Sequence, residues 1–250
     1  MVSEIEYNYY INNVLQYLNA IYPKQNYLFQ DKLEEIKYFM TKYILVLPQN
    51  IGLQLDEILK YQIYRKPIFD ATLIVPQILI INHDITQIKV DTIVNAANAD
   101  GLGCFENGHK CIDNVIHNKA GPKLRLECKK ILNGSKLKTS DTIITHGYNL
   151  PSKYIIHTVG PIYDKSKHIE HSLELEKCYT NCLSLADKYG LRSIVFCCIS
   201  TGIYGFPKDS AARIALNAVN KYIYNTKSKI KIIFCTYTDR DYAIYKNLIN

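Results

Sequence analysis

Two thiols and one imidazole lie within eight residues of each other in the segment Gly103–Cys111. Cys and His are preferred ligands of Zn²⁺, and three protein ligands leave a fourth position open, as in catalytic zinc sites. The spacing of Cys104, His109 and Cys111 matches none of the common structural zinc modules. The residues alone therefore leave two alternatives, a zinc site and a loop whose thiols happen to lie near His109.

A second polar segment, His83-Asp84-Ile85-Thr86, follows directly after the apolar run ILIIN. At the end of a strand, the Asp84 carboxylate is suited to accept a hydrogen bond from an amino group of a nucleotide base. Asp is equally common as the cap of a turn. Asp84 and Ile85 are therefore candidates for a base-binding site, with a simple turn as the alternative.

A third segment, Asn95-Ala96-Ala97-Asn98, ends another predicted strand. Small residues such as Ala96 let a ligand approach the backbone, and the Asn95 and Asn98 amides can donate and accept hydrogen bonds toward ribose hydroxyls. An Asn-rich turn that simply leaves a strand explains the same residues. Spacing alone does not separate these two interpretations.

A fourth segment lies between an apolar run and a predicted helix that begins near Ser210. Its glycines free backbone N–H groups to face a phosphate, and the N-terminus of the following helix favours an anion. No Gly-Lys-Ser/Thr follows, so the segment is not a P-loop. The pattern favours a phosphate cradle over an idle loop, with the candidate residues Ser200, Thr201, Gly202, Ile203, Tyr204, Gly205 and Phe206.

These four segments interrupt an alternation of short β-branched runs with helical patterns, which predicts an α/β layered domain whose ligand loops follow the strand ends. The predicted strands are Leu73–Ile81, Thr92–Asn95, Thr142–Thr145, Tyr154–Thr158, Ser193–Ile199 and Lys229–Cys235. The predicted helices are Ile112–Ala120, Lys123–Leu132, Leu173–Tyr189, Ser210–Tyr224 and Asp239–Leu248.

Ahead of this domain, apolar residues recur at spacings of three and four between Ile5 and Leu59, which predicts helices. We therefore expect two parts, a helical N-terminal extension over residues 1–71 and an α/β domain over 72–250. The helical part is more typical of a packed cover than of an independent domain.

Composition excludes several classes of protein. Hydrophobic residues make up 48% of the 250 residues, enough for a sizeable core, and no apolar run reaches the roughly 18 to 20 residues of a membrane span. The chain opens without the basic residues of an export signal, so we expect a cytoplasmic protein whose eight cysteines are reduced.

Charge is unevenly divided along the chain. Residues 1–75 contain 7 Lys and Arg against 8 Asp and Glu, whereas residues 76–250 contain 23 against 15. A basic α/β part suits an anionic ligand such as a nucleotide. Nucleic-acid binders usually cluster their charge more strongly, so we do not expect a nucleic-acid partner.

In order along the chain, these motifs resemble those of the macrodomains, a family that binds ADP-ribose. The resemblance extends over about residues 72–250 and includes Asp84-Ile85-Thr86, Val94–Asn98, Ile116-His117 with Ala120-Gly121-Pro122, Ile156–Pro161 and Ile199–Pro207. It implies a three-layer α/β/α fold with a mixed central sheet. It also implies that Asp84 and Ile85 face the adenine, Ser200 to Phe206 the pyrophosphate, and Asn98 the distal ribose.

One departure from the common pattern concerns the segment before Asp113. Where most macrodomains carry a run of glycines, this chain has Gly103-Cys104-Phe105 and then His109-Lys110-Cys111. That segment looks like the microbial zinc-containing macrodomains, which also have a helical extension and hydrolyse ADP-ribosyl groups from proteins. The resemblance implies Cys104, His109 and Cys111 as Zn²⁺ ligands and Asn98 and Asp113 as catalytic residues.

By the same resemblance, the substrate is a mono-ADP-ribosylated protein, with a lipoyl-carrier protein modified by a sirtuin-type transferase as candidate partners. Two other functions stay open, a reader module that binds ADP-ribose without cleavage and a deacetylase of O-acetyl-ADP-ribose. Several residues are better explained by packing, namely His117 and His157 and the helical pair Cys178 and Cys182.

Overall fold

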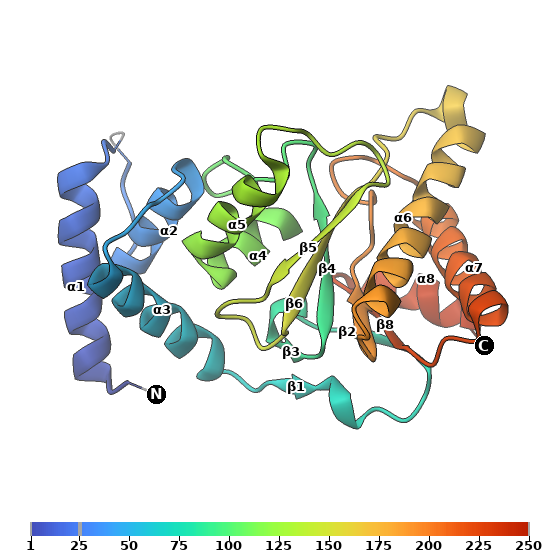
Figure 1. The fold of residues 1–250 in the computed structure, drawn as a ribbon, viewed down its shortest axis with the longest axis horizontal. Coiled ribbons are helices and arrows are strands. Elements are labelled where there is room, and N and C mark those ends of the chain that lie inside the picture. The colour runs from blue at the N-terminus through green and yellow to red at the C-terminus, as the bar shows by residue number, and fades with distance from the viewer. Residues whose placement is uncertain (1, 25–26, 250) are drawn as a thin grey trace.

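The computed structural model describes residues 2–24 and 27–249 and consists of an N-terminal group of helices followed by an α/β part (Figure 1). The main sheet of the described chain is six-stranded, in the order β2-β8-β7-β4-β6-β5. Only β5 and β6 pair antiparallel, so the sheet is mixed, as expected. The strands are β2 Ile78–Asn82, β4 Thr92–Ala97, β5 Thr142–His146, β6 Tyr154–Val159, β7 Ser193–Phe196 and β8 Lys231–Thr236.

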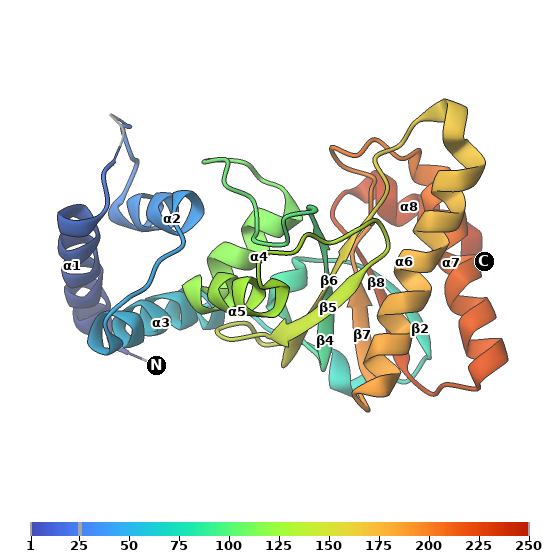
Figure 2. The same cartoon turned by 45° about the horizontal axis from the view of Figure 1, so that its top comes forward.

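Helices cover both faces of this sheet, which confirms the three-layer α/β/α architecture. Figure 2 shows α4 and α5 on one side and α6 and α7 on the other, with α8 beside α7. Apolar strand residues such as Ile93, Ile156 and Phe234 are buried between these layers. The helices are α4 Ile112–Ala120, α5 Pro122–Leu132, α6 His168–Lys188, α7 Lys208–Thr226 and α8 Asp239–Ile249.

The parallel strands end at one common edge, and at the opposite edge Asp91 joins the starts of three of them. The Asp91 carboxylate accepts hydrogen bonds from the Arg192 backbone N–H at 2.9 Å, the Ser193 hydroxyl at 3.2 Å and the Lys153 ammonium at 2.6 Å. Burial alone would raise the pKa of this carboxyl, but the bonds from Lys153 and Arg192 hold it below its usual value. Asp91 thereby ties together the starts of β4, β6 and β7.

The N-terminal helices are α1 Glu4–Ile21, α2 Lys32–Lys42 and α3 Gln49–Tyr64. A capping box of Ser3 and Glu6 starts α1, and the Asp31 side chain caps α2. These helices bury a hydrophobic cluster of their own, which includes Leu18, Phe39 and Leu55. The boundary at residue 71 stays a prediction.

The segment before β2 differs from the prediction of a strand that starts at Leu73. Residues Ala71–Leu73 form a 3-10 turn, η1, whose start is capped by Asp70. Pro76 then lacks the N–H that a ladder requires, so pairing begins only at Ile78. The predicted strand end at Ile199 is also wrong, because β7 stops at Phe196.

Four short elements complete the described fold. The strands β1 Phe69–Asp70 and β3 Ile88–Lys89 pair parallel and connect the helical part to the sheet. The 3-10 helices η2 Ile85–Gln87 and η3 Lys165–Lys167 each begin at a capping Asp.

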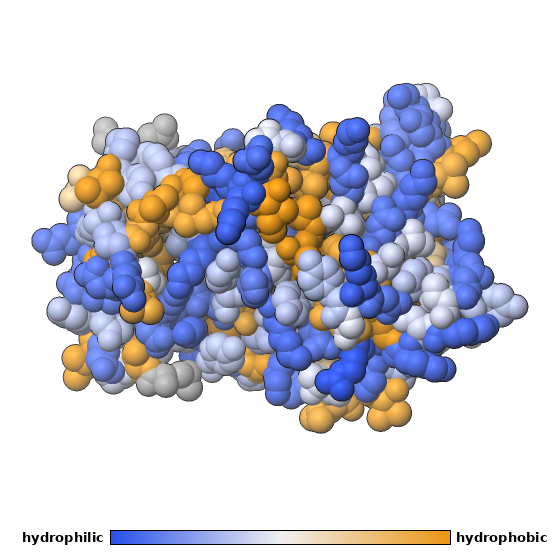
Figure 3. Space-filling model, viewed as in Figure 1, coloured by the Kyte–Doolittle hydropathy of each residue, from blue (hydrophilic) through white to orange (hydrophobic). Residues whose placement is uncertain are grey.

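On the face seen in Figure 3, apolar side chains gather in several places among polar ones. Figure 3 shows apolar residues at the lower edge of the molecule, where the segment between β1 and β2 places Leu73 and Val75 at 78% and 90% exposure. No helix in the described residues combines the length and hydropathy that crossing a membrane requires.

Candidate functional site

The loop between β4 and α4 brings the three predicted zinc ligands together. The donor atoms of Cys104, His109 and Cys111 all lie within 4.8 Å of one another, and the Cys104 sulfur is 3.3 Å from His109 Nδ1. Each sulfur also accepts a backbone N–H, from Glu106 at 3.4 Å and from Asn114 at 3.4 Å. Thiols and an imidazole in this arrangement are a donor set suited to Zn²⁺.

The Cys111 thiol of this cluster keeps its proton at neutral pH. Burial, together with the nearby Cys104 thiol, raises the pKa of Cys111 to about 11. A metal ion lowers thiol pKa values by binding the thiolate form, so metal binding would offset this shift.

The path of the loop depends on Gly103 and Asn98. Gly103 has φ +83°, and a Cβ on it would come within 2.8 Å of the His117 ring, so only glycine fits. The Asn98 side chain donates to the Gly103 carbonyl at 3.1 Å and accepts from the Gly101 N–H at 3.1 Å. Asn98 therefore shapes the start of the loop that carries Cys104, His109 and Cys111.

Asp113 lies in the first turn of α4 and is almost fully buried. Its Oδ1 accepts a hydrogen bond from the Asn95 amide at 2.8 Å, and its Oδ2 lies 3.4 Å from the Asn98 amide nitrogen. Burial raises the pKa of Asp113 to about 6, although the Asn95 bond and the Arg125 charge act in the opposite direction. A carboxyl with this pKa can exchange a proton near neutral pH.

Asn95 does not face open space. It is fully buried in β4, and its amide nitrogen also contacts His157 Nδ1 at 3.1 Å, from the neighbouring position on β6. Because the Asn95 nitrogen is a donor, Nδ1 must accept, and the His157 Nε2–H then donates to the Thr145 hydroxyl at 2.9 Å. Asn95 thus orients Asp113, a different role from the substrate contact that the sequence suggested.

His117 and His157 were assigned to packing, and both are indeed buried. Burial lowers the pKa of His157 to about 4 and that of His117 well below its usual value, so both imidazoles are neutral. His117 Nε2 lies 3.5 Å from Asp113 Oδ1. His117 is therefore next to a predicted catalytic residue, which its spacing in the sequence did not indicate. Cys178 and Cys182 are fully buried between α6 and the sheet, as expected.

The predicted adenine-side residues follow β2. Asp84 caps η2, where its carboxylate accepts from the Thr86 N–H at 3.0 Å and from the Lys119 ammonium at 2.9 Å. These bonds hold the pKa of Asp84 below its usual value against the effect of burial. The Asp84 side chain keeps 41% exposure, whereas Ile85 is buried.

The predicted phosphate loop runs from Ser200 to Phe206 and leads into α7. Its ends are joined by the bond from the Phe206 N–H to the Ser200 carbonyl at 3.0 Å, and Ser200 has φ +64°. The buried Ser200 hydroxyl has no partner among the described protein groups. Gly202 is exposed, and no heavy atom lies within 4 Å of a Cβ built on it. The middle of the loop, with Thr201, Ile203, Tyr204 and Gly205, is therefore open to a ligand.

Arg125 was not predicted from the sequence. Its guanidinium is buried beside the Cys104–Cys111 loop and donates to the Cys104 carbonyl at 3.3 Å. The available signal was an Arg three residues before Cys128, on the apolar stripe of α5. A second group was also not predicted. In the core, the donor atoms of His117, Cys128 and His157 lie within 4.8 Å of one another.

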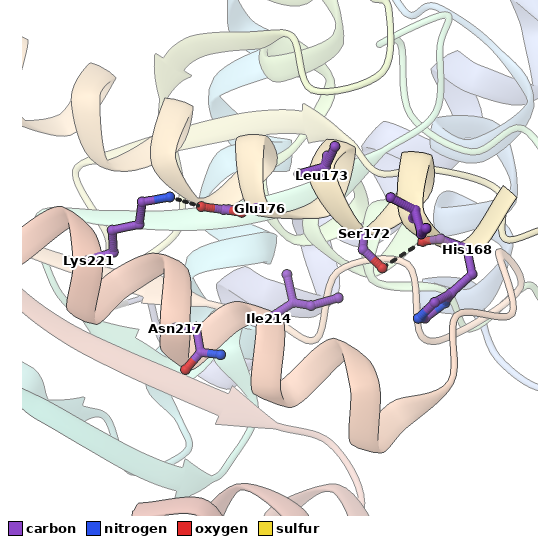
Figure 4. Close-up of a pocket in the computed structure, with 8 residues that line it drawn as sticks. His168, Ser172, Leu173, Glu176, Ile214, Asn217 and Lys221 are labelled. Carbon is purple, nitrogen blue, oxygen red and sulfur yellow. Dashed lines mark hydrogen bonds and ion pairs between the residues drawn. The ribbon is translucent and has the colours of Figure 1, made fainter.

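A hollow of about 470 Å³ lies elsewhere, between α6 and α7 (Figure 4). Figure 4 shows His168, Glu176 and Lys221 at its rim, where Lys221 pairs with Glu176 at 2.9 Å. None of the predicted site residues lines it. The candidate site is therefore defined by side-chain chemistry at the strand ends and not by this hollow.

Comparison with known proteins relates this site to curated hydrolases. A protein named protein-ADP-ribose hydrolase from Staphylococcus aureus is 48% identical over 170 residues, which are 67% of this chain and 64% of the relative. Another protein of that name, from Treponema medium, is 44% identical over 169 residues, with 67% and 65% covered. The match thus spans less than two thirds of the length of these relatives.

Solved structures are similar as well. The Oceanobacillus iheyensis macrodomain with ADP is 38% identical with a TM-score of 0.62, over 68% of this chain and 88% of that one. The Trypanosoma brucei macrodomain in complex with ADP-ribose is 27% identical with a TM-score of 0.67, over 89% and 97%. The model of the Macro domain matches residues 94–215. With this fold and these matches, the chain belongs to the macrodomain family.

Proposed function

We propose that this macrodomain is a zinc-dependent hydrolase that removes mono-ADP-ribose from modified protein side chains. The observation that carries the proposal is the single loop that begins at Asn98, contains the cluster Cys104, His109 and Cys111, and ends at the buried Asp113. A binding module has no need of a buried carboxyl with a raised pKa beside a metal-ligand cluster. The names of the S. aureus and T. medium relatives support the same activity.

Zn²⁺ fits the residues present. Cys104, His109 and Cys111 would hold it, because three soft or borderline donors from one loop leave a position open. When bound, the ion would supply Lewis-acid polarisation of a ribose hydroxyl or of water.

The protein's own groups supply proton transfer and orientation. Asp113 Oδ2 faces Asn98, so this oxygen is the one placed to accept or return a proton, while Oδ1 is held by Asn95. Asn98 would orient the distal ribose through its amide. Since Asp113 is shielded from solvent, its proton exchange is directed to whatever occupies the site.

The remaining contacts would bind the rest of ADP-ribose. We assign the adenine to Asp84 and Ile85 and the pyrophosphate to the Ser200–Phe206 loop. The exposed backbone of that loop and the N-terminus of α7 at Lys208 suit an anion. The bound ADP-ribose named for the T. brucei macrodomain supports this ligand.

The resemblance that suggests zinc also suggests a lipoyl-carrier protein modified by a sirtuin-type transferase, and we propose a cytoplasmic setting for this reaction. All eight cysteines are free, which suits a reducing compartment. A mono-ADP-ribosylated lipoyl-carrier protein is therefore the first substrate to offer.

The deciding experiment measures zinc content and release of ADP-ribose from a defined mono-ADP-ribosylated protein by the same preparation. We expect about one zinc per chain, and loss of both zinc and turnover in a Cys104→Ser, Cys111→Ser double variant that stays folded. Full turnover by metal-free protein would contradict zinc dependence. Binding without turnover would instead establish a reader, and faster turnover of O-acetyl-ADP-ribose would establish a deacetylase.

A further inference from the structure

Arg125 of α5 connects the N-terminal helices to the metal-ligand loop. It is only 3% exposed, and its guanidinium donates to main-chain carbonyls of two separate segments. On one side, Nη1 donates to the end of α2; on the other, Nη2 donates to the Cys104 carbonyl at 3.3 Å. The carbonyls at the end of α2 belong to Met40 at 2.8 Å, Thr41 at 3.0 Å and Tyr43 at 3.0 Å.

The carbonyls that Arg125 binds are available because α2 ends there. The last carbonyls of a helix have no partner within the helix, and a cation is favoured at the negative end of the helix dipole. The ring of Phe105, the residue after Cys104, also lies 4.2 Å from the guanidinium carbon. The first metal-ligand residue is thus held from its carbonyl and from its neighbour.

A second route joins the same end of α2 to the other part of the loop. The Thr41 hydroxyl lies 3.3 Å from Asn114 Oδ1, and Asn118 donates to Thr41 Oγ1 at 3.0 Å. The Asn114 amide donates to the carbonyl of His109 at 2.8 Å and to that of Glu106 at 3.2 Å. The end of α2 is therefore linked through Asn114 to the second metal-ligand residue.

We propose that the N-terminal helices are part of the metal site, because the end of α2 positions the Cys104–Cys111 loop through Arg125 and Asn114. This inference rests on the proposed function in that the loop holds Zn²⁺. Arg125 and Asn114 act as positioning residues, since they bind the backbone of the ligand residues and not their donor atoms. Helices that only covered the domain would not need hydrogen-bonded links from the end of α2 to both sides of this loop.

The test uses the full chain and Zn²⁺ alone as the probe. Arg125→Lys keeps the charge but loses the fork that reaches both segments, and Thr41→Val removes the hydroxyl of the second route while keeping the side-chain shape. Matched controls are Arg213→Lys on the exposed face of α7 and Thr180→Val in α6. Zinc affinity is measured by competition with a chromophoric chelator, and amide exchange is followed over residues 104–111.

We expect zinc affinity to fall about ten-fold in Arg125→Lys and by a smaller factor in Thr41→Val, as when partners of metal ligands are removed. Amides of residues 104–111 should exchange faster in both variants, and neither control should change. Wild-type zinc affinity and exchange in the folded variants would overturn the inference. Should Arg125→Lys fail to fold, Thr41→Val decides.

Failure of the proposed metal site gives a different result. If the unmodified chain binds no Zn²⁺, the zinc proposal is wrong. Amide exchange over residues 104–111 then tests, without the metal, whether the end of α2 positions this loop. Faster exchange in Arg125→Lys or Thr41→Val supports positioning by α2, and unchanged exchange refutes it.

Discussion

At the scale of single residues, the arrangement of Asp113 separates binding from chemistry. An Asp113→Asn variant keeps the shape and the bond from Asn95 but has no proton to exchange. We expect its turnover on mono-ADP-ribosylated protein to fall by about 10²-fold or more, with ADP-ribose affinity nearly unchanged. Kinetics and calorimetric titration check this, with the exposed Asp187→Asn near the end of α6 as control. Equal losses in affinity and turnover would make Asp113 a general ligand contact.

His157 makes the stability of the fold depend on pH. Its pKa is about 4 in the folded protein and 6.5 when exposed, so the unfolded chain binds the extra proton between these values. Stability contributed by the neutral imidazole is therefore complete near pH 7 and is lost as the pH falls, by about 3 kcal/mol at pH 4.

Replacement of His157 by Asn should make this dependence less steep, and the buried His117 should account for the dependence that remains. The Asn oxygen can accept from Asn95 as Nδ1 does, but it does not titrate. Urea unfolding at pH values from 7 to 4 measures the slope, and His171→Asn in α6 serves as control. A variant whose stability falls with pH as steeply as that of the unmodified protein would show that His157 is not the source.

At the scale of elements, the loop from Ser200 to Phe206 has an exposed middle, and its two ends are hydrogen-bonded to each other. Gly202→Glu should abolish ADP-ribose binding, because its carboxylate would lie against the pyrophosphate. Thermal stability should change little, since Gly202 does not need a positive φ and has free space around it. Calorimetric titration checks the binding, and Gly202→Gln separates bulk from charge. An ADP-ribose affinity equal to that of the unmodified protein would show that this loop does not bind the pyrophosphate.

Substitution of Gly160, which packs against Ser200, should lower thermal stability. A Cβ on Gly160 would approach the Ser200 hydroxyl to 2.0 Å, so Gly160→Ala should lower the melting temperature and displace Ser200. Thermal unfolding measures the loss, with Gly190→Ala, which has open space around its Cβ but a positive φ, as a test of backbone strain alone. A smaller loss at Gly160 than at Gly190 would contradict close packing there.

Element positions were predictable to the extent that local patterns define them. The helix Ile112–Ala120 was predicted with the bounds that α4 has, because its apolar spacing is regular and its ends are marked by Cys111 and Gly121. The strand start at Leu73 was wrong, because apolar residues before Pro76 mimic a strand. The role of Arg125 was out of reach, since its partners on α2 lie more than 80 residues away in sequence.

At the scale of the whole molecule, the N-terminal helices and the sheet with its covering helices bury separate hydrophobic clusters, which predicts two levels of stability. Leu18 is fully buried in the cluster of the N-terminal helices, and Leu18→Ala should cost about 3 kcal/mol. Native-state hydrogen exchange should show reduced protection in α1 and α3 with unchanged protection in β4. The exposed Ile5→Ala is the control. Equal loss of protection in α1 and β4 would mean that the chain unfolds as one unit.

The Asp91 junction has a consequence for how such a molecule can change over evolutionary time. Because Asp91 joins the starts of β4, β6 and β7, strand alignment is set at the edge opposite the ligand loops. Insertions and substitutions after the other ends of these strands leave that alignment intact. The same sheet can therefore carry loops that only bind a nucleotide or loops that also hydrolyse its bond to a protein. Evolution can exchange one kind of loop for the other without changing the alignment of the strands.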